Sequence, residues 1–155
     1  MAAYDVSLQR SAPRRMAAVR ARMPVQQVKF SFRDYLDQVY AAGRAGAVKL
    51  DGQNIFLYQP VTDEPEQADV AFGVGTLQPF AGAGNVQPVD LPTGDVATTT
   101  HWGDYSGLGH AHHAVIDWCR ANGHRLSGTR WEIYGHWTDD STKLRTDVCH
   151  LLARA

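Results

Sequence analysis

Glu132 and Tyr134 belong to a ten-residue segment that occurs twice in the chain. Residues 49–58 return as residues 125–134, at a constant offset of 76 positions. Leu, Gly and Tyr are kept in both copies, whereas Phe56 of the first copy is replaced by Glu132 in the second. A duplicated chain that places a carboxylate at an apolar strand position in one copy only is typical of a single asymmetric site.

The alternation of strand side chains predicts which face of the sheet carries this carboxylate. The purely apolar set is expected to pack against helices, and it consists of Ile55, Leu57, Trp131 and Ile133. The opposite face then carries Phe56, Tyr58, Glu132, Tyr134 and His136. If the two copies are related by an approximate two-fold axis, these side chains line a ligand cleft at the junction.

Aromatic rings around a carboxylate favour a cation with a flat apolar body. Each aromatic face attracts a positive charge by roughly 0.5 to 2 kcal/mol, and a partly desolvated carboxylate is unstable until a cation neutralises it. The alternative interpretation is that Glu132 is a solvated residue on the exposed side of a sheet, with Tyr134 merely a good strand former. The residues alone leave both interpretations open.

Two copies of a strand-strand-helix-strand-strand unit are expected to position these residues. The first copy is residues 1–76, the Gly/Pro-rich connector is 77–84, and the second copy is 85–155. Apolar residues at helical spacing predict helices at about 32–44 and 107–122. The sequence therefore predicts one α+β domain, an antiparallel sheet with two helices on one face.

Strand and helix ends are indicated by turn residues and by a capping pattern. Ser31, followed three residues later by Asp34, predicts the start of the first helix. The predicted strands are 4–9, 16–22, 54–59 and 68–76 in the first copy, and 86–91, 96–102, 131–137 and 145–152 in the second.

Composition excludes several classes of partner. The chain has 155 residues, a net charge of −1 and no apolar run near the roughly 20 residues of a membrane helix. We therefore expect no direct contact with nucleic acid and none with a membrane. Cys119 and Cys149 lack metal-type spacing, which favours two buried thiols in a reducing, cytoplasmic location. The N-terminal arginines fit two short strands better than a targeting peptide.

The histidines and tryptophans of the second copy give weaker signals. His101, His110, His112 and His113 crowd one region but point in different directions, so no metal is expected. No phosphate-binding loop, dinucleotide fingerprint or nucleophile elbow is present, and no cofactor is expected. Trp102, beside the loop that enters the second helix, is a candidate stacking wall. Tyr105 either anchors that loop or contacts the ligand.

Several motifs in order resemble one known family. These are His101-Trp102-Gly103-Asp104-Tyr105, Gly128-x-x-x-Glu132-x-Tyr134, and Leu144-Arg145-Thr146-Asp147-Val148. They are similar to the GyrI-like small-molecule-binding domain, the superfamily of effector-binding domains in AraC- and MerR-type multidrug regulators. The resemblance covers nearly the whole chain and implies a ligand cleft in which Glu132 contacts cationic or planar aromatic compounds. Asp104 departs from the proline usual in that family.

Three functions are compatible with this resemblance. The first is a stand-alone protein that binds hydrophobic, planar or cationic small molecules as a sensor or sequestering protein. The second is a hydrolase of reactive cyclopropanoid natural products, which the resemblance also implies, with Glu132 and Tyr134 as catalytic residues in the same cleft. The third, suggested by the family name alone, is a gyrase-interacting inhibitor. The sequence shows no feature that supports a topoisomerase or regulator partner.

Overall fold

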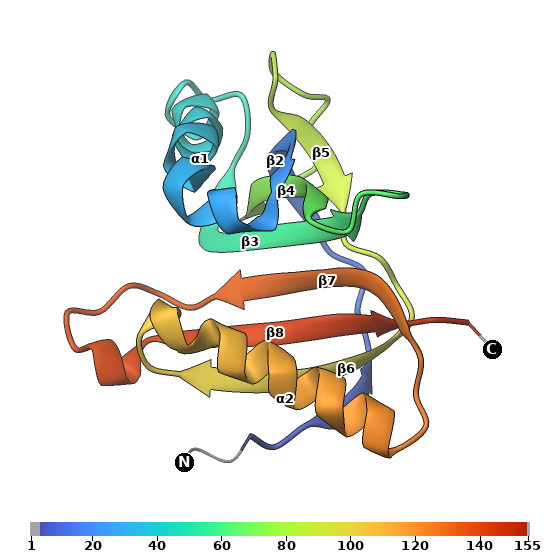
Figure 1. The fold of residues 1–155 in the computed structure, drawn as a ribbon. Coiled ribbons are helices and arrows are strands. Elements are labelled where there is room, and N and C mark those ends of the chain that lie inside the picture. Colours follow the sequence, from blue (N-terminus) through green and yellow to red (C-terminus); the bar gives the residue numbers. More distant parts are fainter. Residues whose placement is uncertain (1–3, 155) are drawn as a thin grey trace. The chain divides into compact units, whose positions relative to one another are not determined.

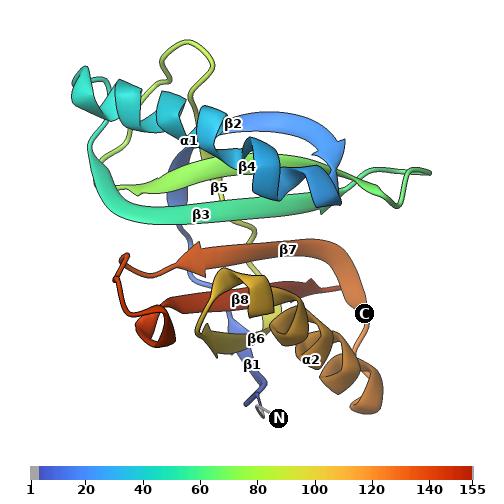
Figure 2. The same cartoon turned by 60° about the vertical axis from the view of Figure 1, so that its left-hand side comes forward.

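The chain folds into two units, each built from a four-stranded antiparallel sheet and one long helix (Figures 1 and 2). The computed structural model describes residues 4–154. The central unit is residues 13–91, and the terminal unit combines the residues up to 12 with those from 92 onwards. The elements are β1 (Ser7–Arg10), β2 (Arg15–Pro24), η1 (Val25–Gln27), α1 (Val28–Arg44), β3 (Leu50–Pro60), β4 (Gln67–Thr76), β5 (Gln87–Asp90), β6 (Asp95–Trp102), η2 (Tyr105–Gly107), α2 (Leu108–Ala121), β7 (Leu126–Tyr134), η3 (Ser141–Lys143) and β8 (Arg145–Leu152).

The central unit has the strand order β3-β4-β2-β5, with α1 on one face of the sheet. Phe56 of β3 lies directly opposite Phe72 of β4. Phe72 stacks on Tyr35 of α1 at 5.0 Å between ring centroids, and Phe56 lies 5.7 Å from Phe32 of the same helix. Aromatic rings therefore join the helix to the middle of this sheet.

The terminal unit has the corresponding order β7-β8-β6-β1, and α2 covers one face of its sheet (Figure 1). The α2 face that meets the sheet is a stripe of small and medium apolar residues at helical spacing. Together with strand residues, this stripe forms the core of the unit, which consists of Ala97, Ala111, Val115, Cys119 and Val148. The predicted α+β fold is confirmed.

The fourth strand of each unit comes from an unexpected part of the chain. β1 precedes β2 in sequence but pairs with β6, and β5 precedes β6 but pairs with β2. The compact units therefore have other boundaries than the predicted copies at 1–76 and 85–155. β1 pairs with a strand of the second predicted copy, and β5 pairs with a strand of the first. The order strand-helix-strand-strand is the same in both units, while their origin by duplication stays a prediction.

The repeated Leu-x-Gly segment forms the same backbone bulge in both units. Gly52 has a φ of +83° and Gly128 a φ of +94°, a region that favours glycine because it has no Cβ. The β3–β4 and β7–β8 registers shift at these points. Next to each glycine, Asp51 Oδ1 accepts from the Gln53 amide, and Ser127 Oγ accepts from the Thr129 amide. The bulge gives a structural reason for the kept glycine.

The first helix begins earlier than its capping pattern predicted. The 3-10 turn η1 leads directly into α1 at Val28, so Ser31 lies within the helix and is not its N-cap. The Ser31 hydroxyl instead accepts a hydrogen bond from Gln27 Nε2 at 3.0 Å. The apolar face of the helix extends one turn further towards the N-terminus than the capping motif indicated, and Val28 is buried.

The predicted orientation of the repeated strands is wrong. Phe56 packs against α1, and Glu132 forms a hydrogen bond with α2, so this pair lies on the helix-covered faces. The set Ile55, Leu57, Trp131 and Ile133 lies on the opposite faces. Because residues 55–58 are all buried, as are Trp131 and Glu132, an apolar alternation cannot distinguish the two faces.

Removal of the Phe72 ring should be the clearest test of this packing. Phe72 is 0% exposed, and we expect Phe72→Ala to lower the free energy of unfolding by about 3 to 5 kcal/mol, because it deletes a packed ring and leaves a cavity. Phe30→Ala is the matched control, since Phe30 is 75% exposed, and should change stability by no more than about 0.5 kcal/mol. Urea denaturation followed by circular dichroism compares the two. Equal losses would contradict the packing described.

Candidate functional site

Glu132 is a buried carboxylate that forms hydrogen bonds with Tyr134 and His112 inside the terminal unit. It lies on β7 and is 6% exposed. The Tyr134 hydroxyl, two residues along the same strand face, donates to Oε1 at 2.6 Å. His112 of α2 places Nε2 at 2.7 Å from Oε2. Both donors stabilise a charged carboxylate, which explains how it is tolerated in the interior.

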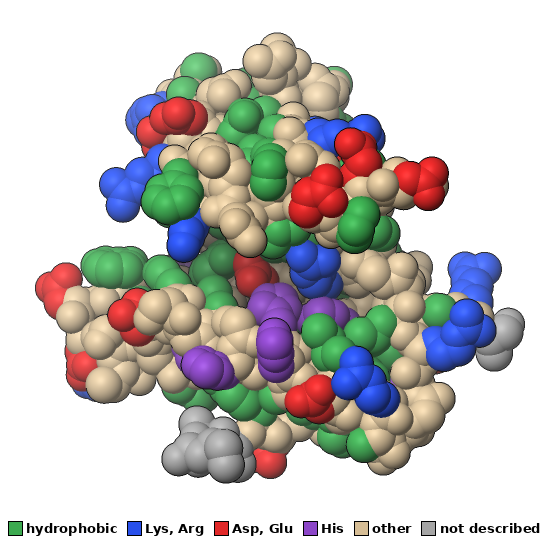
Figure 3. All heavy atoms as spheres, in the orientation of Figure 1, with side chains coloured by type: hydrophobic (Ala, Val, Ile, Leu, Met, Phe, Trp, Pro, Cys, Tyr) green, Lys and Arg blue, Asp and Glu red, His purple; other side chains and the backbone are tan. Residues whose placement is uncertain are grey.

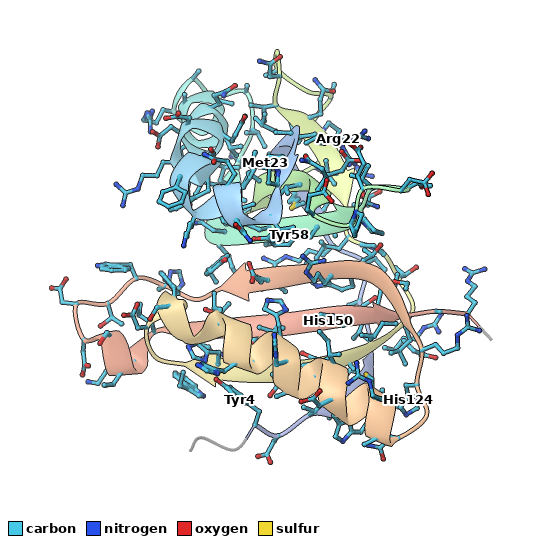
Figure 4. All side chains as sticks on the ribbon, viewed as in Figure 1. Tyr4, Arg22, Met23, Tyr58, His124 and His150 are labelled. Carbon is cyan, nitrogen blue, oxygen red and sulfur yellow. The ribbon has the colours of Figure 1, made fainter. Side chains whose placement is uncertain are left out.

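His150 extends this network by one more side chain. It lies on β8, is 4% exposed, and places Nε2 at 2.8 Å from His112 Nδ1 (labelled in Figure 4). The two imidazole rings meet nearly edge-on, with centroids 5.1 Å apart. Burial, and then the positive charges of His112 and Arg130, lower the pKa of His150 to about 3. His150 is therefore a neutral imidazole near pH 7.

A small group of aromatic rings begins at Tyr134, whose hydroxyl donates to the carboxylate. Tyr105 of η2 meets Tyr134 edge-to-face at 5.4 Å, and Trp137 lies 6.4 Å from Tyr105. Burial raises the pKa of the Tyr105 hydroxyl, so this ring stays neutral. Tyr134, which donates to the buried acid, is thus the first of three neighbouring rings, and aromatic faces attract cations with flat apolar bodies.

His101 fixes the loop that carries Tyr105. Its Nε2 lies 2.8 Å from the Asp104 carbonyl oxygen and must therefore donate, so Nδ1 accepts from the Tyr4 hydroxyl at 2.8 Å. A Cβ at Gly107 would approach the His101 ring to 2.8 Å. His101 thus holds the loop around Asp104 in place.

The remaining predicted site residues have different settings. Trp102 is 60% exposed, and Arg145 stacks over it at 5.7 Å. Since Trp102 pairs with Arg145, while Tyr134 pairs with the next residue of β8, Trp102 points to the face opposite the carboxylate. His136 is exposed, beyond the end of β7. Phe56 and Tyr58 are buried in the central unit.

Two residues of the network were not assigned to the site from the sequence. His112 was considered from the sequence only among the clustered histidines, without a partner. His150 lies two positions from Val148, which pairs with Glu132, and so it shares the face of the carboxylate, a relation that only the strand register shows. In Figure 3, histidine side chains gather over α2, where the sequence places His110, His112 and His113.

The described residues were searched for metal clusters and for membrane-spanning helices. Within residues 4–154, no group of three or more His, Cys, Asp or Glu side chains is arranged to hold a metal ion. No helix among these residues is both long and apolar enough to cross a membrane.

The depressed pKa of His150 should make folding sensitive to acid. In the unfolded chain this imidazole takes up a proton near its ordinary pKa of 6.5, whereas in the folded protein it does so only near 3. Stability is therefore lost as pH falls through this window. We expect urea denaturation to show a smaller loss from pH 7 to pH 4 in His150→Gln than in the wild type. His113→Gln, at an exposed position, should behave as the wild type. An unchanged loss in His150→Gln would contradict the assignment.

Comparisons with known proteins agree on one family. The family model of the GyrI-like small molecule binding domain matches residues 4–152. No curated protein sequence matches the chain. Among solved structures, the EcmrR C-terminal domain is similar with a TM-score of 0.76 at 19% identity, covering 98% of this chain and 99% of that one.

Two further structures share the fold at lower identity. SAV2435 bound to tetraphenylphosphonium has a TM-score of 0.68 at 12% identity, over 96% of this chain and 94% of its own. A hydrolase from Listeria innocua has a TM-score of 0.56 at 12% identity, over 96% and 91%. These likenesses show the fold, and the family model covers nearly every residue. The chain belongs to the GyrI-like small molecule binding domain family.

Proposed function

We propose that the chain binds hydrophobic cationic small molecules and that Glu132 supplies the counter-charge. The observation that carries this proposal is a buried carboxylate hydrogen-bonded to Tyr134, whose ring meets the ring of Tyr105. A carboxylate in the interior costs several kcal/mol, and the hydrogen bonds from Tyr134 and His112 offset part of this cost. A ligand cation that approaches it therefore gains more than the same cation gains at an exposed acid.

Membership of a small-molecule-binding family supports the same proposal, as does the tetraphenylphosphonium cation bound by SAV2435. The ligand of this chain would have a delocalised or shielded positive charge, because aromatic faces bind such a charge without a strong hydration penalty. A sensor or a sequestering protein needs this binding step and no chemistry. Trp102, His136, Phe56 and Tyr58 stay predicted contributors from the sequence.

Glu132→Gln should isolate the charge of this residue. The substitution keeps the shape of the side chain and removes its negative charge, so we expect the Kd for tetraphenylphosphonium to rise at least about tenfold, equivalent to roughly 1.4 kcal/mol. Isothermal titration calorimetry at pH 8 measures it. Glu66→Gln removes an exposed acid as the matched control and should leave the Kd unchanged. If a folded Glu132→Gln protein bound the cation as tightly as the wild type, the role of Glu132 would be rejected.

A hydrolase is the second candidate, favoured by the chain of hydrogen bonds from His112 through Glu132 to Tyr134. An acid-base pair of this kind can take a proton from water and return one to a leaving carbon or oxygen. Buried Thr146 Oγ1 has no hydrogen-bond partner among the described residues, and Thr146 pairs with Tyr134 across the strands. Such a hydroxyl is a point at which substrate or water can be held.

Turnover distinguishes the two candidates. We expect an alkylating cyclopropane compound incubated with a hydrolase of this type to gain the mass of one water molecule, with the rate lost in Glu132→Gln. Mass spectrometry of the recovered compound makes the comparison. Recovery of the intact compound at the rate of a protein-free control would reject the hydrolase and leave the binding protein.

A further inference from the structure

One edge of β2 in the central unit is only partly covered by another strand. β2 pairs with β4 along residues 16–24, whereas on its other side β5 pairs with residues 15–18 alone. Within residues 4–154, no further strand pairs with residues 19–24 on that side. We call this stretch the open edge of β2. An unpaired edge presents backbone donors and acceptors to any chain that can form a strand beside it.

β5 does not extend along this edge, because the chain turns back just before it. Ala83 and Val86 exchange two backbone hydrogen bonds, at 2.8 and 3.0 Å, which closes a two-residue turn at Gly84 and Asn85. Gly84 has a φ of +59°, a conformation that glycine favours, and Gln87 Nε2 donates to its carbonyl oxygen at 2.9 Å. The open edge is therefore built into the unit and does not come from a frayed strand end.

The hydrogen bonds at the start of β2 show which residues direct their backbone groups at the open edge. The Arg14 carbonyl oxygen accepts from the amide that follows β5, at 2.9 Å. The Arg15 carbonyl oxygen accepts from the Thr76 hydroxyl of β4, at 3.2 Å. In an antiparallel sheet both backbone groups of a residue point to one side, and the side alternates along the strand. Arg20 and Arg22, an even number of positions after Arg14, therefore direct their N–H and C=O groups at the open edge.

The side chains of these two arginines leave the edge uncovered. Edge strands are commonly protected by charged side chains or by a covering element. Here Arg22 forms an ion pair with Asp69 of β4 at 2.8 Å, and Arg20 donates to Gln59 of β3 at 3.4 Å. Both partners lie on the far side of β2 from β5. Both guanidinium groups therefore lean away from the open edge.

A groove of about 370 Å³ lies beside this edge, and its lining comes from the central unit alone. α1 contributes Tyr35 and Gln38, about one turn apart, and the turn before β5 contributes Asn85. Val19 and Arg20 line it from β2. The volume is at the lower end of the range of ligand pockets. A few residues of extended chain, each about 3.3 Å long, match this size.

We propose that the open edge of β2 binds an extended acidic peptide, which adds to the sheet as a short antiparallel strand in line with β5. The peptide residue opposite Arg20 exchanges two backbone hydrogen bonds with it, and the residue two positions away does the same with Arg22. In this mode of recognition, main-chain hydrogen bonds supply the affinity and side-chain contacts the specificity. The site belongs to the central unit and Glu132 to the terminal unit, so the proposal is independent of the proposed function.

The alternation of strand side chains predicts which peptide side chains this edge prefers. A side chain opposite Arg20 lies on the same face as the guanidinium group. Among the described residues that line the groove, Arg20 alone carries a charge, which favours a carboxylate at that position. The next peptide side chain lies on the face of Val19, whose cross-strand partner Phe72 stacks on Tyr35, and an apolar group fits there. The partner is therefore a segment in which acidic and apolar residues alternate.

The experiment uses the full chain and a fluorescein-labelled hexapeptide with blocked ends, in which valine and glutamate alternate. Methylation of the glutamate amides removes the N–H groups that face Arg20 and Arg22, so we expect the Kd to rise at least about tenfold. Methylation of the valine amides alters only the outer edge of the bound peptide and should change the Kd much less. Fluorescence polarisation compares the three peptides.

Arg20→Gln tests the preference for a carboxylate. The substitution keeps both backbone groups and removes the charge, so the Kd for the glutamate peptide should rise about two- to fivefold, the size expected of an exposed ion pair. The Kd for a peptide with lysine in place of glutamate should not rise. Arg44→Gln changes an exposed arginine of α1 as the matched control and should keep the wild-type preference.

Amide hydrogen exchange of the wild type locates the bound peptide. The amides of Arg20 and Arg22 should exchange more slowly when the peptide saturates the chain, whereas those of Val19 and Ala21, which face β4, should not change. Binding without this protection would overturn the inference, as would no binding at all or an equal loss of affinity in both methylated peptides. Equal affinity for the glutamate and lysine peptides would overturn it as well. Should Arg20→Gln fail to fold, the exchange of the wild type decides.

Discussion

A carboxylate in the interior of a sheet is the constraint on which the terminal unit depends. Glu132 is buried on the face that α2 covers, and a charge there is stable only with donors held in fixed places. Tyr134, on the same strand face, is one donor, and His112 of the helix is another. Loss of either would leave a buried charge with one partner fewer, a change that commonly costs several kcal/mol.

The surrounding structure serves to hold those donors in place. The β7–β8 register puts His150 on the same face as Glu132, and the stripe of Ala111, Val115 and Cys119 fixes how α2 lies on the sheet. The Gly128 bulge shifts the register just before the site begins. The hydrogen bonds of His101 hold the loop that brings Tyr105 against Tyr134. A site built on strands and a packed helix is held more rigidly than one built on loops.

The sequence predicted the helices and strands and singled out Glu132, but it did not predict the side chains that surround Glu132. The repeat identified Glu132 and Tyr134, because a carboxylate that replaces Phe56 has no packing reason to be there. The predicted sheet face of Phe56 and Glu132 was wrong. Ile55 and Phe56 are both buried, and in a strand buried on both sides the alternation of side chains does not show which face meets the helix. His112 and His150 are 38 positions apart in sequence, and only the packing of α2 on β8 brings them together. β1 and β5 have only four residues each, too few for their side-chain pattern to indicate which strand they pair with.

A structure of the protein with tetraphenylphosphonium tests the central claim most directly. The account predicts the cation in contact with the Tyr134 and Tyr105 rings, with its phosphorus centre on the side of Glu132 and the bonds from His112 and Tyr134 still formed. A cation bound elsewhere on the protein, with Glu132 shielded from it by other side chains, would contradict the claim that this buried acid is the binding determinant.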